Sequence, residues 1–92
     1  MGKSKFAVSD YLDSPDMIAG YLNEALETGD TQLIAKAIGN VARAKGMAVI
    51  ARDTGMAREH LYKALSEDGK PEFATVMKAL NALGIKLSAK AA

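Results

Sequence analysis

The sequence predicts a small all-α domain built from five helices. Five successive segments carry apolar residues at the i, i+3, i+4 and i+7 spacing of one face of an α-helix. Glycines and capping residues separate these segments at the places where helices begin and end. The chain has 92 residues, which suits one domain with a modest core. We therefore expect residues 1–92 to form a single domain.

The first helix is predicted to begin after Ser14. Ser14 is a suitable N-cap, Pro15 suits the first helical position, and Asp16 is favourable at the positive end of the helix dipole. Gly29 ends this helix because glycine readily adopts a left-handed conformation. The apolar face of the helix comprises Ile18, Tyr21, Leu22, Ala25 and Leu26.

Four more helices follow the same logic. Asp30 caps a second helix, which ends at Gly46, and its apolar face comprises Leu33, Ile34, Ala37, Ile38 and Val41. Residues 47–54 form a short third helix, and residues 58 to about 66 form a fourth. A turn over residues 67–71 precedes the fifth helix, whose apolar face comprises Phe73, Val76, Met77, Leu80 and Leu83.

Two terminal segments lie outside the helical pattern. Residues 85–87 alternate apolar and charged side chains, which predicts a short strand. Residues 6–12, within an N-terminal arm of residues 1–13, fit either a second short strand or an ordered arm. Both segments are candidates for the contact between two copies of the chain in a homodimer.

The helical stripes together predict the hydrophobic core. The internal methionines are expected to fill gaps in it. The predicted core comprises Ile18, Leu22, Leu26, Ile34, Ile38, Val41, Ile50, Leu61, Leu65, Val76, Met77, Leu80 and Leu83.

The composition argues against several classes of protein. No cysteine is present, so disulfide scaffolds, thiolate zinc sites and cysteine nucleophiles are excluded. A single histidine, His60, leaves little for a metal cluster or a catalytic triad. No apolar run approaches the roughly 18 residues of a membrane helix, and no apolar stretch follows the basic start as in a signal peptide. We expect a cytoplasmic binding protein without cofactor, metal or catalytic residues.

Residues 47–66 have the pattern of a helix-turn-helix, the motif that places a helix in the major groove of DNA. Ala51 lies four residues before Gly55, and its small side chain lets the second helix cross close to the first. Gly55 suits a sharp turn with positive φ. Leu61, six residues after Gly55, is expected to point inward between the helices.

If Leu61 points inward, the opposite face of its helix carries polar and aromatic groups. Arginine pairs with guanine and glutamate with cytosine, so the predicted base-reading residues are Arg58, Glu59 and Tyr62. The predicted phosphate contacts are Arg52, Lys63 and Ser66. The alternative is an ordinary solvated helix with mixed charges. Ala57 stands at the N-cap position of this helix and offers no side-chain acceptor.

Charge is divided unevenly along the chain. Residues 1–40 carry three Lys against six Asp and Glu, a net charge of −3, whereas residues 41–92 carry nine Lys and Arg against five Asp and Glu, a net charge of +4. This division suggests a basic partner for residues 1–40 and a polyanion for residues 41–92. The alternative is an accidental division between solvated helix faces.

Several stretches together resemble the bacterial addiction-module antidote family, specifically HigA-like antitoxins with a lambda-repressor-like helix-turn-helix. The resemblance covers roughly residues 6–88 and departs at Ala57, where the family usually has serine. Its motifs are Tyr11-Leu12-Asp13, residues 18–27, Ile50-Ala51-Arg52-Asp53-Thr54-Gly55, residues 58–66 with Gly69, and residues 80–87.

The resemblance implies a five-helix lambda-repressor-like fold and two tasks. The protein would neutralise a toxin of the RelE/ParE kind and repress its own operon by binding operator DNA. A toxin that handles nucleic acid is expected to be basic. The acidic residues 1–40 would therefore contribute to toxin binding. The candidate toxin contacts are Asp10, Asp13, Asp16, Glu24 and Glu27.

Two alternatives to a DNA-binding antitoxin remain at this point. One is a stand-alone phage-type or chromosomal repressor without a toxin partner. The other is a protein-interaction module whose helix-turn-helix no longer binds DNA, and an absence of nucleic-acid binding at low salt would favour it.

Overall fold

The computed structural model describes residues 14–92 and confirms the all-α prediction. It contains the helices α2 (Pro15–Thr28), α3 (Thr31–Lys45), α4 (Met47–Thr54), α5 (Arg58–Ala64) and α6 (Phe73–Ala82). Residues 14–92 contain no β-strand. The predicted N-terminal arm, its possible strand at residues 6–12, and the candidates Asp10 and Asp13 lie outside the described residues. Within residues 14–92, every helix is too short or too polar to span a membrane.

The predicted caps hold the ends of α2 and the start of α3. The Ser14 side chain accepts a hydrogen bond from the backbone N–H of Met17 at 3.3 Å. Gly29 follows α2 with a φ of 69°, and its N–H donates to the carbonyl of Leu26. The Asp30 carboxylate accepts from two backbone N–H groups at the start of α3. These short-range interactions fix the sharp reversal between the two helices.

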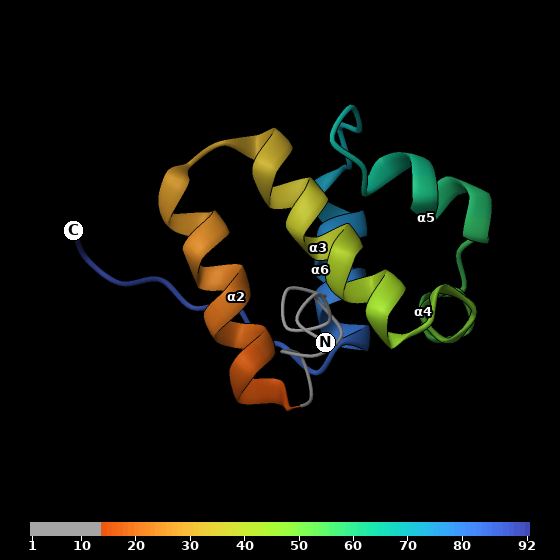
Figure 1. Cartoon of the computed structure of the whole chain (residues 1–92), viewed down its shortest axis with the longest axis horizontal. Coiled ribbons are helices and arrows are strands. Elements are labelled where there is room, and N and C mark those ends of the chain that lie inside the picture. Colours follow the sequence, from red (N-terminus) through yellow and green to blue (C-terminus); the bar gives the residue numbers. More distant parts are fainter. Residues whose placement is uncertain (1–13) are drawn as a thin grey trace, which may run out of the picture.

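Helix α3 lies at the centre of the molecule and contacts each of the other four helices (Figure 1). Helices α2 and α5 lie on opposite sides of α3 in this view. The core between the helices is one cluster of buried side chains, comprising Ile18, Leu22, Ala25, Ala37, Ile38, Val41, Ala42, Met47, Ile50, Leu61, Leu65, Ala79, Leu80 and Leu83. Ile34 and Val76 pack against this cluster but are only partly buried.

Two predicted core residues are wrong: Leu26 and Met77 are each 39% exposed. Two further members of the predicted apolar faces, Leu33 and Phe73, are 48% and 71% exposed. Among the internal methionines, Met47 is buried, Met56 is partly buried, and Met17 and Met77 are exposed. A helical period identifies the direction of an apolar face but not its width, so side chains at the flanks of a stripe remain uncovered.

The predicted strand at residues 85–87 is also wrong. The chain turns at Gly84, with a φ of 77°, and the Ile85 N–H donates to the Leu80 carbonyl at 2.9 Å. The alternation of residue types instead packs Ile85 and Leu87 partly against the core of their own chain. The fourth helix ends at Ala64, two residues before the predicted end, because Leu65 leaves the helical conformation.

Candidate functional site

Helices α4 and α5 are joined by the three residues 55–57, the predicted helix-turn-helix-like arrangement. Gly55 has a φ of 74°, and its N–H donates to the carbonyl of Ala51 at 2.9 Å. The Thr54 hydroxyl donates to the Ile50 carbonyl at 2.8 Å and accepts from the Met56 N–H at 3.2 Å. Thr54 thus ties the end of α4 to the turn. This role of Thr54 was not predicted from the sequence, although a threonine next to a turn glycine is a recognisable signal.

Buried side chains hold α5 against the rest of the molecule. Leu61 has no exposed surface, as predicted, and neither does Leu65. Ala51 of α4 is partly buried and packs against the core. A Cβ atom on Gly39 of α3 would collide with the carbonyl oxygen of Leu65, so only glycine permits this close approach. The sequence alone did not identify Gly39, because its partner is a backbone group 26 positions later in the chain.

The side chains predicted to contact DNA lie on α4, α5 and the residues just after α5. The exposed residues of this set are Arg52, Arg58, Glu59, Tyr62 and Lys63. Ser66 is half-buried, and its hydroxyl donates to the Lys63 carbonyl at 2.9 Å. Arg52 lies 3.4 Å from the Asp53 carboxylate, and both groups are well exposed, so this ion pair binds Arg52 only weakly.

The start of α5 lacks a side-chain cap, as the sequence predicts. Ala57 has an extended backbone conformation, with a φ of −68° and a ψ of 141°, and no side chain accepts from the first N–H groups of α5. The conformation is therefore that of a normal N-cap, and only the acceptor group is missing.

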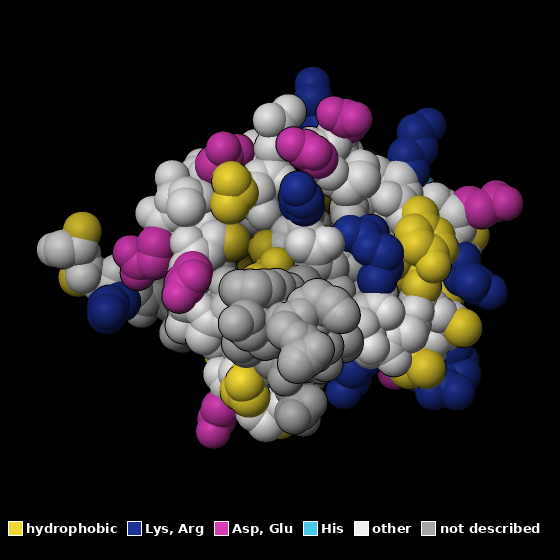
Figure 2. Space-filling view, in the orientation of Figure 1, with side chains coloured by type: hydrophobic (Ala, Val, Ile, Leu, Met, Phe, Trp, Pro, Cys, Tyr) yellow, Lys and Arg dark blue, Asp and Glu magenta, His cyan; other side chains and the backbone are white. Residues whose placement is uncertain are grey.

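Acidic and basic side chains are unevenly distributed over the described helices. Residues 43–63 carry five Lys and Arg against two Asp and Glu, and Figure 2 shows Lys and Arg gathered toward α4 and α5. Helix α2 contains no Lys or Arg, and its acidic residues Asp16, Glu24 and Glu27 are all exposed. Figure 2 shows acidic side chains over α2. Helix α2 is thus acidic, whereas residues 43–63 carry an excess of cations.

No cluster of metal-ligating side chains occurs among residues 14–92. His60 is exposed on α5 and belongs to no group of three or more such side chains within the described part of the chain. The exposed groups around α5 are suited to hydrogen bonding and charge pairing at a surface.

Comparison with known proteins supports the resemblance to the addiction-module antidote family. The model of a family described as probable addiction module antidote protein matches residues 2–91. A protein of Haemophilus influenzae, itself described as uncharacterized, is 51% identical over 81 residues, covering 88% of this chain and 84% of its own. No solved structure matches the chain. The chain belongs to the family of probable addiction module antidote proteins, which indicates a regulatory antitoxin role with a toxin as partner.

Proposed function

We propose that this protein is an antitoxin that also binds operator DNA through α4 and α5 and represses its own operon. The observation that carries the proposal is the placement of α5. Leu61 and Leu65 are fully buried, while Arg58 and Tyr62 on the same helix are exposed. A helix held in this way can place its outer face in the major groove of DNA while its inner face stays packed against the core.

The first turn of α5 has the chemistry for reading bases. Arg58 and Glu59 are the first two residues of the helix, the end that enters the major groove in helix-turn-helix proteins. Arginine donates two hydrogen bonds to guanine, and glutamate accepts from the amino group of cytosine. Tyr62 lies about one turn further along and offers an aromatic surface to a thymine methyl group.

Cationic and hydroxyl groups beside this face suit the DNA backbone. Lys63 and Arg52 are exposed cations on α5 and α4, and Ser66 follows α5. Contacts of this kind set the register of a protein on the duplex and make its affinity depend on salt. The excess of positive charge over residues 43–63 supports this assignment.

Specific binding would require two copies of the chain. Helix α5 has only seven residues, so one copy reads few base pairs. A symmetric homodimer would place two such helices in half-sites about 34 Å apart. Residues 6–12 remain a candidate for the dimer contact. Residues 85–87 are a weaker one, because Ile85 and Leu87 already pack partly on their own core.

For the toxin, we propose a small basic protein of the RelE/ParE kind that meets the chain in the cytoplasm. Asp16, Glu24 and Glu27 present three carboxylates on α2 with no cation on the same helix. Complementary charge of this sort accelerates encounter more than it strengthens the final complex. Asp10 and Asp13, just before α2 in the sequence, would add to the same field.

The experiment measures binding to the promoter duplex upstream of the gene and to a scrambled duplex at several salt concentrations. Arg58→Ala should cost about 1–3 kcal/mol on the promoter and relax sequence preference. Lys63→Ala should weaken both duplexes equally and lower the salt slope by about one unit per contact. Lys78→Ala, an exposed lysine of α6, is the matched control and should change neither value. If Arg58→Ala and Lys63→Ala both bind like the wild type, the DNA-binding proposal is wrong and a pure interaction module is favoured.

A further inference from the structure

The side chain of Asn40 on α3 connects two other polar side chains. Its amide nitrogen donates to the Tyr21 hydroxyl of α2 at 3.1 Å, and its amide oxygen accepts from the Arg43 guanidinium at 2.7 Å. Arginine only donates hydrogen bonds, so the amide oxygen must face Arg43 and the amide nitrogen must face Tyr21. Tyr21 and Asn40 are partly buried, whereas Arg43 is exposed. A partly buried pair from two helices thus orients an exposed guanidinium group.

The charge of Arg43 remains available to an anion outside the chain. Its hydrogen-bond partner in the protein is a neutral amide, which leaves the positive charge unpaired by that contact. Within residues 14–92 the ion pairs are Lys36–Glu67 and Arg52–Asp53, and neither involves Arg43. A guanidinium group presents a planar fork of donors that matches two oxygens of a phosphate group. Arg43 therefore has the chemistry of an oriented phosphate ligand.

Arg43 lies on the side of α3 that borders the residues directly after α5. A Cβ atom on Gly39 would meet the Leu65 carbonyl, and the Lys36 ammonium group approaches the Glu67 carboxylate at 3.9 Å. With about 3.6 residues per turn, Arg43 points in a direction between those of Gly39 and Lys36. It lies in the last turn of α3, next to α4. Figure 2 shows Lys and Arg side chains over α3 as well as over α4 and α5. Arg43 thus adjoins the surface that carries the predicted DNA contacts.

We propose that Arg43 contacts a phosphate of the bound promoter DNA, and that Asn40 and Tyr21 hold its guanidinium group in position. The inference rests on the DNA-binding role proposed above and extends the interface from α4 and α5 to α3. A basic toxin would repel this cation, whereas a DNA phosphate beside α5 would attract it. A guanidinium group that is already oriented loses less side-chain freedom on meeting the phosphate, which strengthens the contact.

The test measures binding of the full-length protein to the promoter duplex and to a scrambled duplex at several salt concentrations. Arg43→Ala should weaken both duplexes by the same factor, about three- to tenfold, and lower the salt slope by about one unit per contact. Arg43→Gln removes the charge but keeps an N–H donor for Asn40, so it should lower the slope equally even if Arg43→Ala is unstable. Lys78→Ala, an exposed lysine of α6, is the matched control and should change neither value.

The positioning role of Asn40 is tested through Arg43. Asn40→Ala leaves every charge in place, so it should weaken both duplexes about two- to threefold with an unchanged salt slope. In an Arg43→Ala background, the same substitution should have no further effect on DNA binding. Tyr21→Phe removes the hydroxyl that accepts from Asn40 and should act in the same direction with a smaller loss. An Asn40→Ala loss that persists in the Arg43→Ala background would show an effect on the fold and overturn the positioning role.

The outcomes separate this contact from the DNA-binding role itself. If Arg58→Ala and Lys63→Ala change binding and the Arg43 variants do not, the α3 contact is overturned while DNA binding through α4 and α5 stands. If the wild type binds neither duplex, both are overturned. If Arg43→Ala loses affinity for the promoter duplex alone, Arg43 reads a base, and the phosphate assignment is overturned.

Discussion

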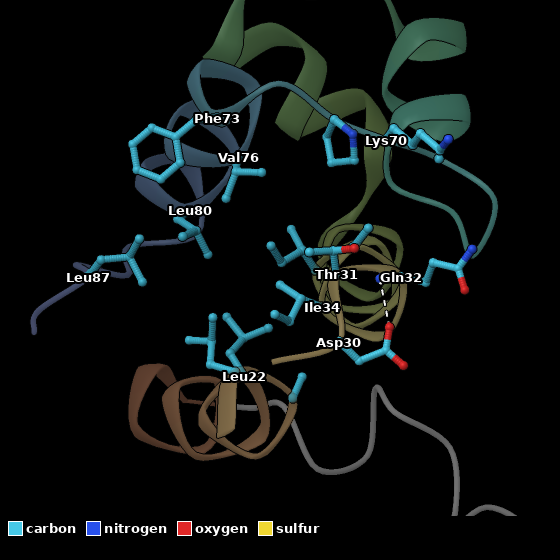
Figure 3. Close-up of a pocket in the computed structure, with 16 residues that line it drawn as sticks. Leu22, Asp30, Thr31, Gln32, Ile34, Lys70, Phe73, Val76, Leu80 and Leu87 are labelled. Carbon is cyan, nitrogen blue, oxygen red and sulfur yellow. Dashed lines mark hydrogen bonds between the residues drawn. The ribbon is translucent and has the colours of Figure 1, made fainter. Parts of the chain in front are cut away.

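Helix α5 and a groove of about 690 Å³ between α2, α3 and α6 (Figure 3) are both anchored in one hydrophobic core, yet they present opposite chemistry to solvent. Leu61 and Leu65 behind α5 belong to the same buried cluster as Leu22 and Leu80 at the base of the groove. The outer face of α5 is polar and convex, with one large aromatic group, Tyr62. The groove is concave and mainly apolar, and its charged lining residues are Asp30 and Lys70.

This difference shows that the two surfaces suit different kinds of contact. A nucleic acid requires an exposed helix with cations nearby, whereas a protein partner gains affinity from apolar area that it covers. In this chain, α3 lines the groove and also packs against α5 (Figure 1). Changes to exposed residues of one surface should leave the other intact, whereas changes to the shared packing should damage both.

The largest effect is expected from Leu61→Ala, which removes a fully buried side chain behind α5. Lost apolar burial and the resulting cavity should lower the free energy of unfolding by about 2–5 kcal/mol. Tyr62→Ala, the next residue, is the control: its side chain is 41% exposed, so the expected loss is at most about 1 kcal/mol. Urea unfolding measures both, and equal losses would contradict the inward placement of Leu61.

Gly39→Ala should have the next largest effect. The added methyl group meets the Leu65 carbonyl oxygen, so α3 and the end of α5 must move apart. We expect the free energy of unfolding to fall by about 1–3 kcal/mol, with weaker DNA binding. Gly20→Ala is the control, because a Cβ atom there meets nothing within 4 Å and alanine is the better helix former, adding about 0.5–1 kcal/mol. A neutral Gly39→Ala would show that this close approach does not position α5.

The contrast between Gly39 and Gly55 shows what the sequence could and could not predict. Gly55 was predicted because its requirement is local: the chain must turn with positive φ between two helices, and the observed φ is 74°. The same local logic predicted the caps at Ser14 and Asp30. The role of Gly39 depends on a distant carbonyl group, which only the packed structure reveals.

The groove was missed for a related physical reason. Phe73 and Leu26, which line the groove, fit the helical stripes, so both were predicted to lie on apolar faces and Leu26 to lie in the core. Whether an apolar side chain is covered depends on how far its neighbours extend, and the helical period carries no such information. The outer face of α5 was easier to predict, because a single inward residue, Leu61, fixes it.

A smaller effect is expected from the acidic surface of α2. Glu24→Gln together with Glu27→Gln should slow association with the toxin about two- to fivefold at low salt, and the difference should shrink as salt is added. Stopped-flow mixing with the purified protein encoded by the adjacent gene, the candidate toxin, measures this rate. Asp68→Asn, an exposed carboxylate of the α5–α6 loop, is the control. A reduction that does not depend on salt would argue against electrostatic steering.

The smallest effect concerns the missing cap of α5. Ala57→Ser supplies an acceptor for the first backbone N–H groups of the helix, at a position whose backbone already has N-cap geometry. The free energy of unfolding should rise by about 0.5–1 kcal/mol. Ala57→Val is the comparison, since it adds no acceptor and valine is no better an N-cap residue than alanine. Thermal unfolding monitored by circular dichroism distinguishes the two, and equal melting temperatures would show that the start of α5 gains nothing from a side-chain cap.

The placement of DNA binding on α5, and not at the groove, is the central claim, and the most direct measurement determines DNA affinity for three proteins. The wild type, Arg58→Ala and Phe73→Gln are each titrated with the promoter duplex and with a scrambled duplex. We predict that Arg58→Ala loses about tenfold in affinity for the promoter duplex. Phe73→Gln changes an exposed residue that lines the groove, so it should bind both duplexes like the wild type. An unchanged affinity in Arg58→Ala, or a loss in Phe73→Gln with stability unchanged, would contradict the claim.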